Sequence, residues 1–522
     1  MKPEKQEEDG LYKWLGLLVV VVGTFMAILD TSIVNIAIPK MMAVFGVTED
    51  SIKWVLTGYM LTMGMVIPLT GYLGDRFGAK KLYIWALAVF TAGSALCGLA
   101  PSNSFMIVAR IIQALGGGMI MPVGMAMIYQ MFPPSERGTA LGVWGIAAMA
   151  APAIGPTTGG FIVQYMDWRL IFTVNIPVGV VGVILAILLL RELPKRPTKG
   201  FDWIGALSSA VGLSCLLYVL GESSIDWGDF SNMLLVLVGV FSIVLFVVNE
   251  LTHPDPLLDL RLLKIWPFTL SILISSTVGI ALFGGVFLLP IFWQNLQGFT
   301  ALQTGMFMFP SAVATGITMP ISGKLFDKFG GKPVVLPGLI LLAITTYQLT
   351  TINLNTDPHT IMILYMLRGV GIGLAMMPSS TIGMNAVPIQ LIGRASALSN
   401  VVRQIANSLG VTVLTTFMTN TQIVTYFGMA EKVNWFNSSS LYLMNALKGL
   451  FMQGGMYAGD AQGVSTQVLY GILQRQALVQ AIDDTFFVTF LIVVVAIFLG
   501  LLIPKNKPLA EASSSEHHAI ME

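Results

Sequence analysis

The ten residues GYLGDRFGAK at positions 71–80 return as GKLFDKFGGK at positions 323–332. Six of the ten positions are identical, and a seventh exchanges Arg for Lys. Each copy is a short charged stretch between two long apolar runs. Two matching loops of this kind predict that the chain consists of two equivalent halves in the same orientation.

The composition around these loops is that of a membrane protein. The 522-residue chain is 55% hydrophobic and 11% charged, with a mean hydropathy of +0.78, whereas soluble domains carry about 25% charged residues. The net charge of +1 and the absence of a basic stripe give no indication of a nucleic-acid partner.

Cys97 and Cys215 fall inside apolar runs, and the four histidines lack metal-ligand spacing, so we expect no disulfide framework, metal or cofactor. The sequence shows no nucleophile–base set or phosphate loop, and we therefore expect no enzyme.

Fourteen apolar runs of roughly 20 residues predict fourteen transmembrane helices and an all-α polytopic fold. The first run is too long for the core of a signal peptide, so we expect it to remain as a membrane helix. The predicted spans cover residues 14–38, 52–73, 82–100, 104–132, 138–163, 170–191, 203–221, 231–251, 266–292, 301–323, 334–354, 359–386, 395–419 and 485–504.

The basic residues predict the orientation of these spans. With both termini in the cytoplasm, the segments on that side hold 19 of the 28 Lys and Arg residues, against six outside and three within spans. Positively charged loops stay on the cytoplasmic side of a membrane. We therefore expect a multi-pass protein in the bilayer of the cytoplasmic (inner) membrane, with both termini inside the cell.

The repeat also predicts how the chain is divided. Shifting Trp14 by 252 residues gives Trp266, the start of the ninth span. Six spans therefore repeat as six, with spans seven and eight inserted between them. Secondary transporters are built from repeats with a binding site between the halves. The expected segments are a cytoplasmic tail at 1–13, a six-helix bundle at 14–191, a linker with the two inserted helices at 192–265, a second bundle at 266–504 that includes an external loop at 420–484, and a tail at 505–522.

One acidic residue, Asp30, lies deep inside a predicted span. Ionisable groups are costly in a membrane, and they face a cavity or a partner. Burial favours the uncharged form of a carboxylic acid, which lets it exchange a proton near neutral pH. Arg110 lies at a similar depth in the fourth span, and Gln113 follows one turn later. We predict an Asp30–Arg110 contact that protonation of Asp30 weakens; the alternatives are an acid that only ties helices together and a permanent structural ion pair.

The fifth span carries the stretch APAIGPTTGG at 151–160. Its GxxxG pair permits close helix approach, and its two prolines favour a bend. The doubled Gly-Pro arrangement is more specific than a GxxxG pair alone. The residues of this motif are Pro152, Gly155, Pro156, Gly159 and Gly160.

Together with the two loops and the residues around Asp30 and Arg110, this motif resembles the major facilitator superfamily. The chain is similar over nearly its whole length to the fourteen-helix drug:proton antiporter family of EmrB/QacA type. The stretch NIPVG at 175–179 fits the sixth helix of that family. The resemblance implies a major facilitator fold of two six-helix bundles plus two extra helices, and multidrug efflux by alternating access in exchange for protons, which gives antibiotic resistance.

The repeated loops have a physical interpretation as gates. Gly71 and Gly78 permit close helix packing and a tight turn, and Asp75 sits at a helix end. A carboxylate there can bridge to a neighbouring helix or its N-terminus and hold the cytoplasmic side shut. The alternative is that the basic residues of the loop only set the topology. The predicted gate residues are Gly71, Asp75, Arg76, Gly78 and Lys80, with Asp327 and Gly330 in the second copy.

The second half differs from the first in its intramembrane charges. Arg368 and Arg403 lie within spans and have no acid beside them in these spans. Relatives that export dications carry extra membrane acids, so the resemblance favours small lipophilic substrates that are neutral or anionic. The alternative is that Arg403 only binds carbonyls or faces the cytoplasmic interface. The candidate residues of a substrate cavity are Asn35, Gln113, Arg368, Asn400, Arg403 and Asn407.

The external segment 420–484 contains amphipathic stretches at 441–451 and 468–482. A lid, a membrane-surface element and a docking site are all compatible with them. The resemblance implies a membrane-fusion adaptor as partner if the cell has two membranes. The functional alternatives to drug export are a dedicated exporter of a metabolite, lipid or fatty acid, and a non-transporting membrane sensor.

Overall fold

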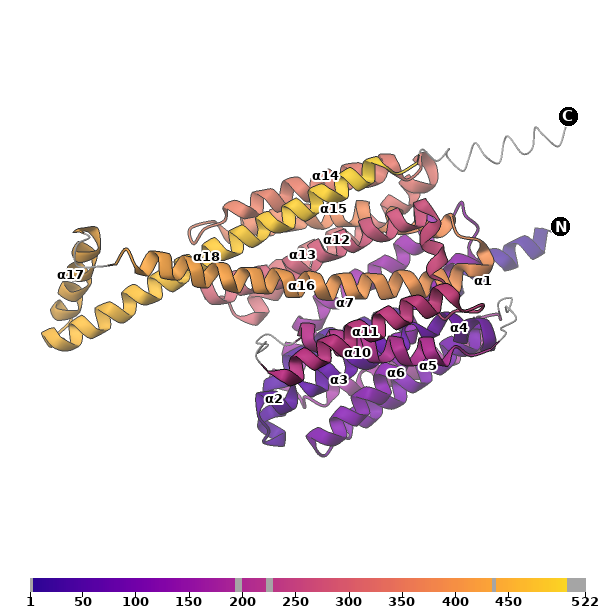
Figure 1. The fold of residues 1–522 in the computed structure, drawn as a ribbon, viewed down its shortest axis with the longest axis horizontal. Helices are drawn as coiled ribbons and strands as arrows, with labels where there is room; N and C mark the ends of the chain where they lie inside the picture. Colours follow the sequence, from indigo (N-terminus) through magenta and orange to yellow (C-terminus); the bar gives the residue numbers. More distant parts are fainter. Residues whose placement is uncertain (1–2, 193–199, 222–228, 434–437, 505–522) are drawn as a thin grey trace.

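The computed structural model describes residues 3–192, 200–221, 229–433 and 438–504, and the regular elements in these ranges are all helices (Figure 1). Ten helices in the described part are long and apolar enough to cross a membrane, and the bent pair α3–α4 makes an eleventh. The predicted tail 505–522 and residues 193–199 of the predicted linker lie outside the described residues.

Each of the fourteen predicted spans falls on a helix or a bent helix pair. In the first half, α3 and α4 bend by 56° where Pro68 interrupts the helical hydrogen bonds. The helices of this half are α1 (Pro3–Phe45), α2 (Glu49–Ile52), α3 (Trp54–Val66), α4 (Leu69–Phe77), α5 (Ala79–Gly98), α6 (Asn103–Met131), α7 (Arg137–Tyr165), α8 (Leu170–Thr173) and α9 (Asn175–Leu189).

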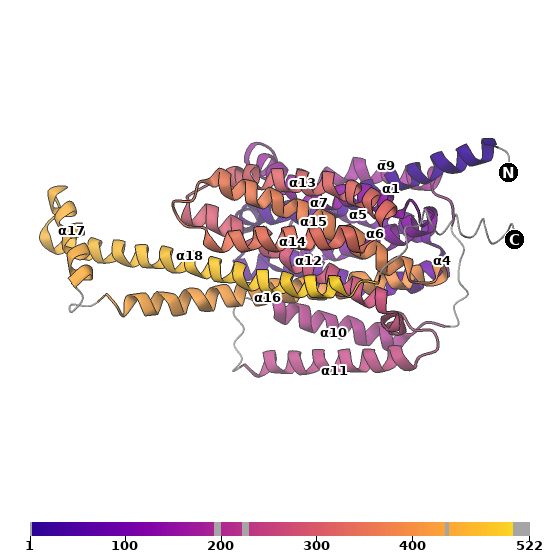
Figure 2. The ribbon, with the colours of Figure 1, turned by 90° about the horizontal axis from the view of Figure 1, so that it is seen from above.

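The second half repeats this arrangement after an inserted pair of helices. The pair consists of α10 (Trp203–Gly221) and α11 (Phe230–Thr252), which lie side by side along one flank of the bundle (Figure 2). The helices of the second half are α12 (Trp266–Ile291), α13 (Ala301–Phe329), α14 (Lys332–Gln348), α15 (Pro358–Asn385), α16 (Ile392–Ala430), α17 (Ser438–Gln453) and α18 (Ala458–Leu501).

Two helices of the second half are much longer than a bilayer requires. The 39 residues of α16 and the 44 residues of α18 measure about 58 Å and 66 Å at the usual rise of a helix, against a hydrocarbon core of about 30 Å. Both project from the bundle and carry α17 at their tip (Figures 1 and 2). Most of the predicted loop 420–484 is therefore helical in its described residues.

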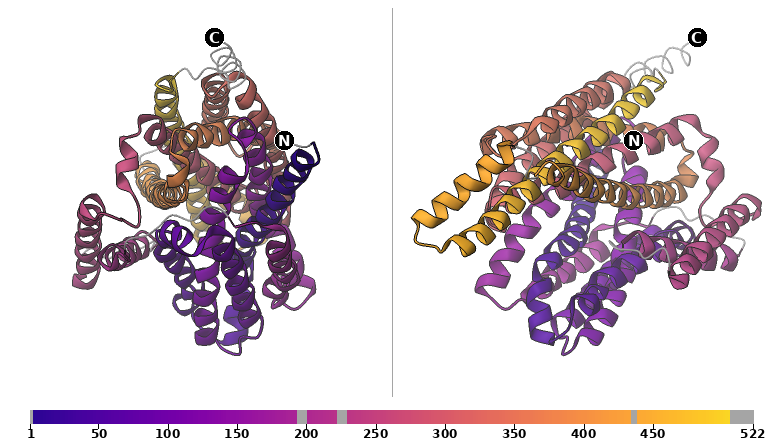
Figure 3. Two further views of the ribbon diagram at one scale, coloured as in Figure 1. Left: turned by 90° about the vertical axis from the view of Figure 1, so that its right-hand side faces the viewer. Right: turned by 60° about the vertical axis from the view of Figure 1, so that its left-hand side comes forward.

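The two halves share one hydrophobic core at the end where α1 begins and α18 ends, which we call the terminal end. The buried cluster there joins Tyr83 and Phe132 of the first half to Phe268 and Leu398 of the second. Towards the opposite end, separate clusters form within each half, one around Phe172 and one around Trp293. The end-on view separates the two bundles (Figure 3, left). The halves are thus packed together at the terminal end.

Candidate functional site

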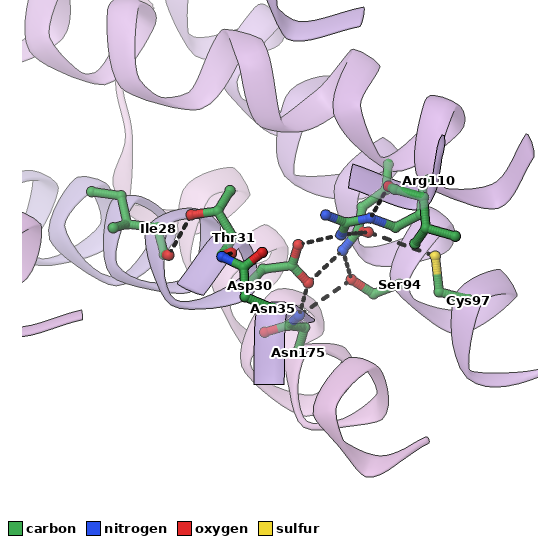
Figure 4. Close-up of polar contacts among 10 residues, drawn as sticks. Ile28, Asp30, Thr31, Asn35, Ser94, Cys97, Arg110 and Asn175 are labelled. Carbon is green, nitrogen blue, oxygen red and sulfur yellow. Dashed lines mark hydrogen bonds and ion pairs between the residues drawn. The ribbon is translucent and has the colours of Figure 1, made fainter. Parts of the chain in front are cut away.

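Asp30 of α1 is fully buried and lies at the centre of a network of polar side chains (Figure 4). Arg110 of α6 donates a hydrogen bond from Nη1 to Asp30 Oδ2 at 2.6 Å. Gln113 Nε2 and Asn175 Nδ2 donate to Asp30 Oδ1 at 2.9 and 2.8 Å. The carboxylate therefore accepts three hydrogen bonds, one of them from a cation.

Further side chains hold the donors of this network in place. Gln113 Nε2 also donates to Ser94 Oγ at 2.6 Å, and its Oε1 accepts from Arg110 Nη1 at 2.7 Å. The Arg110 guanidinium stacks 3.9 Å from the ring centroid of Tyr59. Because α5 approaches α6 closely at Gly93, where a Cβ would lie 2.5 Å from Gln113 Cα, Ser94 comes within reach. The network joins α1, α3, α5, α6 and α9.

The predicted contact between Asp30 and Arg110 is thus present in the structure, while its role in proton coupling stays a prediction. Asn175 belongs to the NIPVG stretch, which by itself predicts no contact with Asp30. An amide in an otherwise apolar helix needs a hydrogen-bond partner once it is buried, and this is the feature of the sequence that indicates its role. Ser94 and Tyr59 gave no such signal, because serine and tyrosine are common in apolar helices.

The motif in α7 packs against α1 one turn from Asp30. A Cβ on Gly155 would lie 2.4 Å from Ser32 Oγ, and one on Gly159 would lie 2.7 Å from Ile33. Ser32 Oγ donates to the carbonyl of Pro152 at 3.2 Å. Gly160 has no such neighbour within 4 Å. The side chain of Pro156 lies outside the described residues, and the bend predicted for this helix stays a prediction.

Gly155→Leu is expected to abolish activity by forcing α7 away from α1 and Asp30. The side chain meets Ser32 and the Ile33 backbone, and overpacking of a tight contact costs about 1–3 kcal/mol or more. Gly160→Leu adds the same side chain where space is open, and we expect it to be tolerated. Transport and thermal stability of the two purified variants check this; equal losses in both would contradict the packing argument.

The first gate loop contacts the second half of the molecule. Asp75, near the end of α4, accepts from Arg394 Nε at the start of α16, with Oδ2 at 3.0 Å. Gly71 allows this approach, because a Cβ there would lie 3.2 Å from Arg394 Cα. Gly78 then turns the chain into α5 with φ +96°, a conformation that favours glycine. The remaining loop residues, Arg76 and Lys80, contact their own half at Tyr72 and Ile187.

The second gate loop makes the related contact with the first half. Asp327 Oδ2 accepts from the backbone N–H of Thr139 at 3.3 Å and from its hydroxyl at 3.1 Å, at the start of α7. The backbones touch where Gly323 faces Gly138. Gly330 ends α13 with φ +83°, as Gly78 ends α4. Each half thus places its loop aspartate on the start of a helix in the other half, and the gate role predicted for these contacts stays a prediction.

The candidate cavity residues fall into three places. Gln113 belongs to the Asp30 network, and Asn35 is an exposed residue of α1 that donates to Thr31 O at 3.4 Å. On α16, Arg403 donates to Asn400 Oδ1, and Asn407 lies against Gly279 of α12. Arg368 stands apart from both groups inside the second half.

Arg368 of α15 is the buried arginine of the second half. It is fully buried, donating from Nε to Thr346 Oγ1 at 3.3 Å and from Nη2 to the Ala281 carbonyl. Its Nη1 has no hydrogen-bond partner among the described residues. The acid of the first half is not repeated, since Leu282 stands where the 252-residue shift of the gate loops would place a second Asp30.

Comparison with known proteins shows which family this sequence resembles. A family model described as Major Facilitator Superfamily matches residues 20–411. The MFS-type transporter YhcA of Bacillus subtilis is 39% identical over 489 residues, which cover 93% of this chain and 92% of YhcA. The multidrug export protein EmrB of Escherichia coli is 31% identical over 451 residues, which cover 85% of this chain and 88% of EmrB.

A solved structure shows the same fold. The MFS proton:xylose symporter XylE, bound to 6-bromo-6-deoxy-D-glucose, superposes with a TM-score of 0.59 at 14% identity. The match covers 96% of this chain and 98% of that of XylE.

Proposed function

The chain belongs to the major facilitator superfamily, and we propose that it exports lipophilic toxic compounds, neutral or anionic, in exchange for protons by alternating access. The family and the all-α polytopic fold are those of membrane transporters rather than enzymes. The similarity to a multidrug export protein over most of both chains supports drug efflux.

The observation that carries the proposal is the buried Asp30 network. Protonation of Asp30 removes the counter-ion of Arg110. The guanidinium of Arg110 then lies buried without an opposing charge, which costs about 3–5 kcal/mol. The helices that carry Asp30 and its three hydrogen-bond donors, α1, α6 and α9, relieve this cost by moving relative to one another. Proton binding thereby changes the preferred conformation, which is the requirement for coupling transport to protons.

The direction of export rests on the orientation predicted from the basic loops. That orientation places the terminal end in the cytoplasm, so the gate contacts of Asp75 and Asp327 close the cytoplasmic side. An exporter must open this side to take up substrate and close it before release outside. The two loops supply contacts that form and break between the halves in that cycle.

The substrate class rests on the charges of the second half. Arg368 and Arg403 place two cations within the helices of that half, and Arg403 lies on the same face of α16 as Asn400. Positive charge within these helices favours neutral and anionic compounds over dications. Substrate identity also separates a multidrug exporter from a dedicated exporter of one metabolite, lipid or fatty acid.

A substrate screen in everted membrane vesicles tests this function. We expect several unrelated neutral or anionic amphiphiles to release protons from vesicles that carry an imposed pH gradient, and dicationic antiseptics to release none. Vesicles without the protein are the control. Proton release by a single fatty acid or metabolite alone would favour the dedicated exporter, and release by no compound would favour the sensor.

A further inference from the structure

The closed gate at the terminal end contains a second carboxylate, which comes from the inserted helix pair. Arg394 donates from Nε to Asp75 Oδ2 at 3.0 Å and from Nη2 to Asp255 Oδ1 at 2.5 Å. Asp255 lies in the connection between α11 and α12. The side chains of Arg394 and Asp255 are 1% and 8% exposed. One buried guanidinium therefore joins both halves and the insertion.

The segment that carries Asp255 is fixed by contacts of its own. Glu250, fully buried near the end of α11, accepts from the backbone N–H of Leu258 at 3.1 Å. Arg261 donates to the Leu251 carbonyl at 3.1 Å. Leu258 belongs to the core cluster that both halves share. Asp255 is thus held in position between two anchored points rather than carried on a free loop.

The inserted pair is packed on the first half of the molecule. Tyr218 of α10 stacks on Trp54 of α3, with ring centroids 5.7 Å apart. Leu217 fills the space in front of Gly64, where a Cβ would lie 2.8 Å from it. Because the pair rests on α3, a movement that separates Arg394 from Asp75 also pulls Arg394 away from Asp255.

The start of α10 is tied to the end of α11 as well. Asn249 Nδ2 donates to Asp202 Oδ2 at 2.6 Å, and the Asp202 carboxylate also accepts from the backbone N–H of Gly205 at 2.8 Å. Asn249 precedes Glu250, so the same turn of α11 that positions the Asp255 segment is held against α10. The two inserted helices are therefore joined at the end that carries the Asp255 segment.

We propose that Asp255 is a positioning residue of the gate, through which the inserted helix pair stabilises the conformation closed at the terminal end. A guanidinium presents its donors in a fixed planar fork, so it can bind two carboxylates at once. Asp75 and Asp255 accept from different nitrogens of this group, Nε and Nη2, and together hold Arg394. The inference rests on the alternating-access function proposed above, because a gate residue matters only in a molecule that opens.

Distances across the terminal end of the full chain test the proposal. Spin labels at Lys81→Cys on α5 and Lys328→Cys on α13, both exposed positions, are measured by double electron–electron resonance in lipid nanodiscs, in a background with Cys97→Ala and Cys215→Ala. We expect Asp255→Asn to raise the ratio of open to closed molecules at least about tenfold, which is the effect of losing a charge-assisted hydrogen bond.

The matched control is Asp259→Asn. It removes the same charge four residues further along, where the side chain accepts from the Arg261 backbone N–H at 3.2 Å, a contact that asparagine retains. We expect its distances to equal those of the parent protein. Asp255→Glu, measured alongside, keeps the charge and should shift the ratio less than Asp255→Asn.

Two results would overturn the proposal. If Asp255→Asn leaves the distances unchanged while Asp75→Asn shifts them, Asp75 alone holds Arg394. If Asp259→Asn shifts them as much as Asp255→Asn, the charge of the segment acts rather than the contact. No substrate is added in this measurement, so a failure of the proposed drug export shows in the vesicle screen and leaves the distance result standing.

Discussion

Asp30→Asn is expected to reduce proton-driven transport to the level of liposomes without protein. Asparagine keeps the shape of the side chain but cannot exchange a proton. It also turns an amide towards Arg110, Gln113 and Asn175, which are all donors to Asp30. Transport in proteoliposomes with an imposed pH gradient checks the prediction.

The control for this experiment is Asp357→Asn, the same chemical change at an acid that is 62% exposed before α15. We expect it to transport at the parent rate, because an exposed carboxylate there contributes little. Full-rate transport by Asp30→Asn, at equal protein content, would show that Asp30 takes no part in coupling.

A double substitution separates proton coupling from a permanent structural ion pair. Removing one partner of a buried pair costs about 3–5 kcal/mol, whereas replacing both is often neutral. We therefore expect Asp30→Asn with Arg110→Gln to recover the thermal stability lost in Asp30→Asn alone. If the pair were only structural, transport would recover as well; if Asp30 carries the proton, stability returns and proton-driven transport does not.

The Asp30–Arg110 contact could be predicted from the sequence because it follows from depth alone. Helical rise places each residue at a known distance from the end of its span, and two opposite charges at equal depth in an apolar medium attract one another. The register of the repeat similarly related the two loops and the two bundles. The local sequence pattern was sufficient to predict those features that depend only on a residue's position along one helix.

The partners of the gate loops could not be predicted in this way. Arg394 meets Asp75 across 319 residues and Asp255 across 139, and no periodicity relates these positions. The packing of two bundles sets which helix starts face one another. The role of Asp255 could not be predicted either, because it lies in a short polar connection, where acids are usually solvated.

The lengths of α16 and α18 could not be predicted because hydropathy indicates where a span leaves the bilayer and not where its helix ends.

Asp75→Asn is expected to open the terminal end far more than Asp327→Asn, although the two residues are equivalent in the repeat. Asp75 binds the cation of Arg394, and a hydrogen bond to a charged group contributes about 1.5–3 kcal/mol, roughly a tenfold to 150-fold change in the ratio of open to closed molecules. Asp327 instead binds the start of α7 through Thr139, where the helix dipole contributes about 0.3–1 kcal/mol, at most about fivefold.

The cause of this asymmetry lies in the two helix starts. Arg137 corresponds to Arg394 in the repeat, but it donates to Asn385 at 2.8 Å and to the Phe132 carbonyl at 3.1 Å. Asparagine at position 327 still accepts from Thr139, whereas asparagine at position 75 loses the charge that Arg394 binds. Distances between spin labels at Lys81→Cys and Lys328→Cys, measured in the two variants, check the order. Equal shifts would mean that both loops close the gate by the dipole and by packing, and that the ion pair with Arg394 contributes nothing.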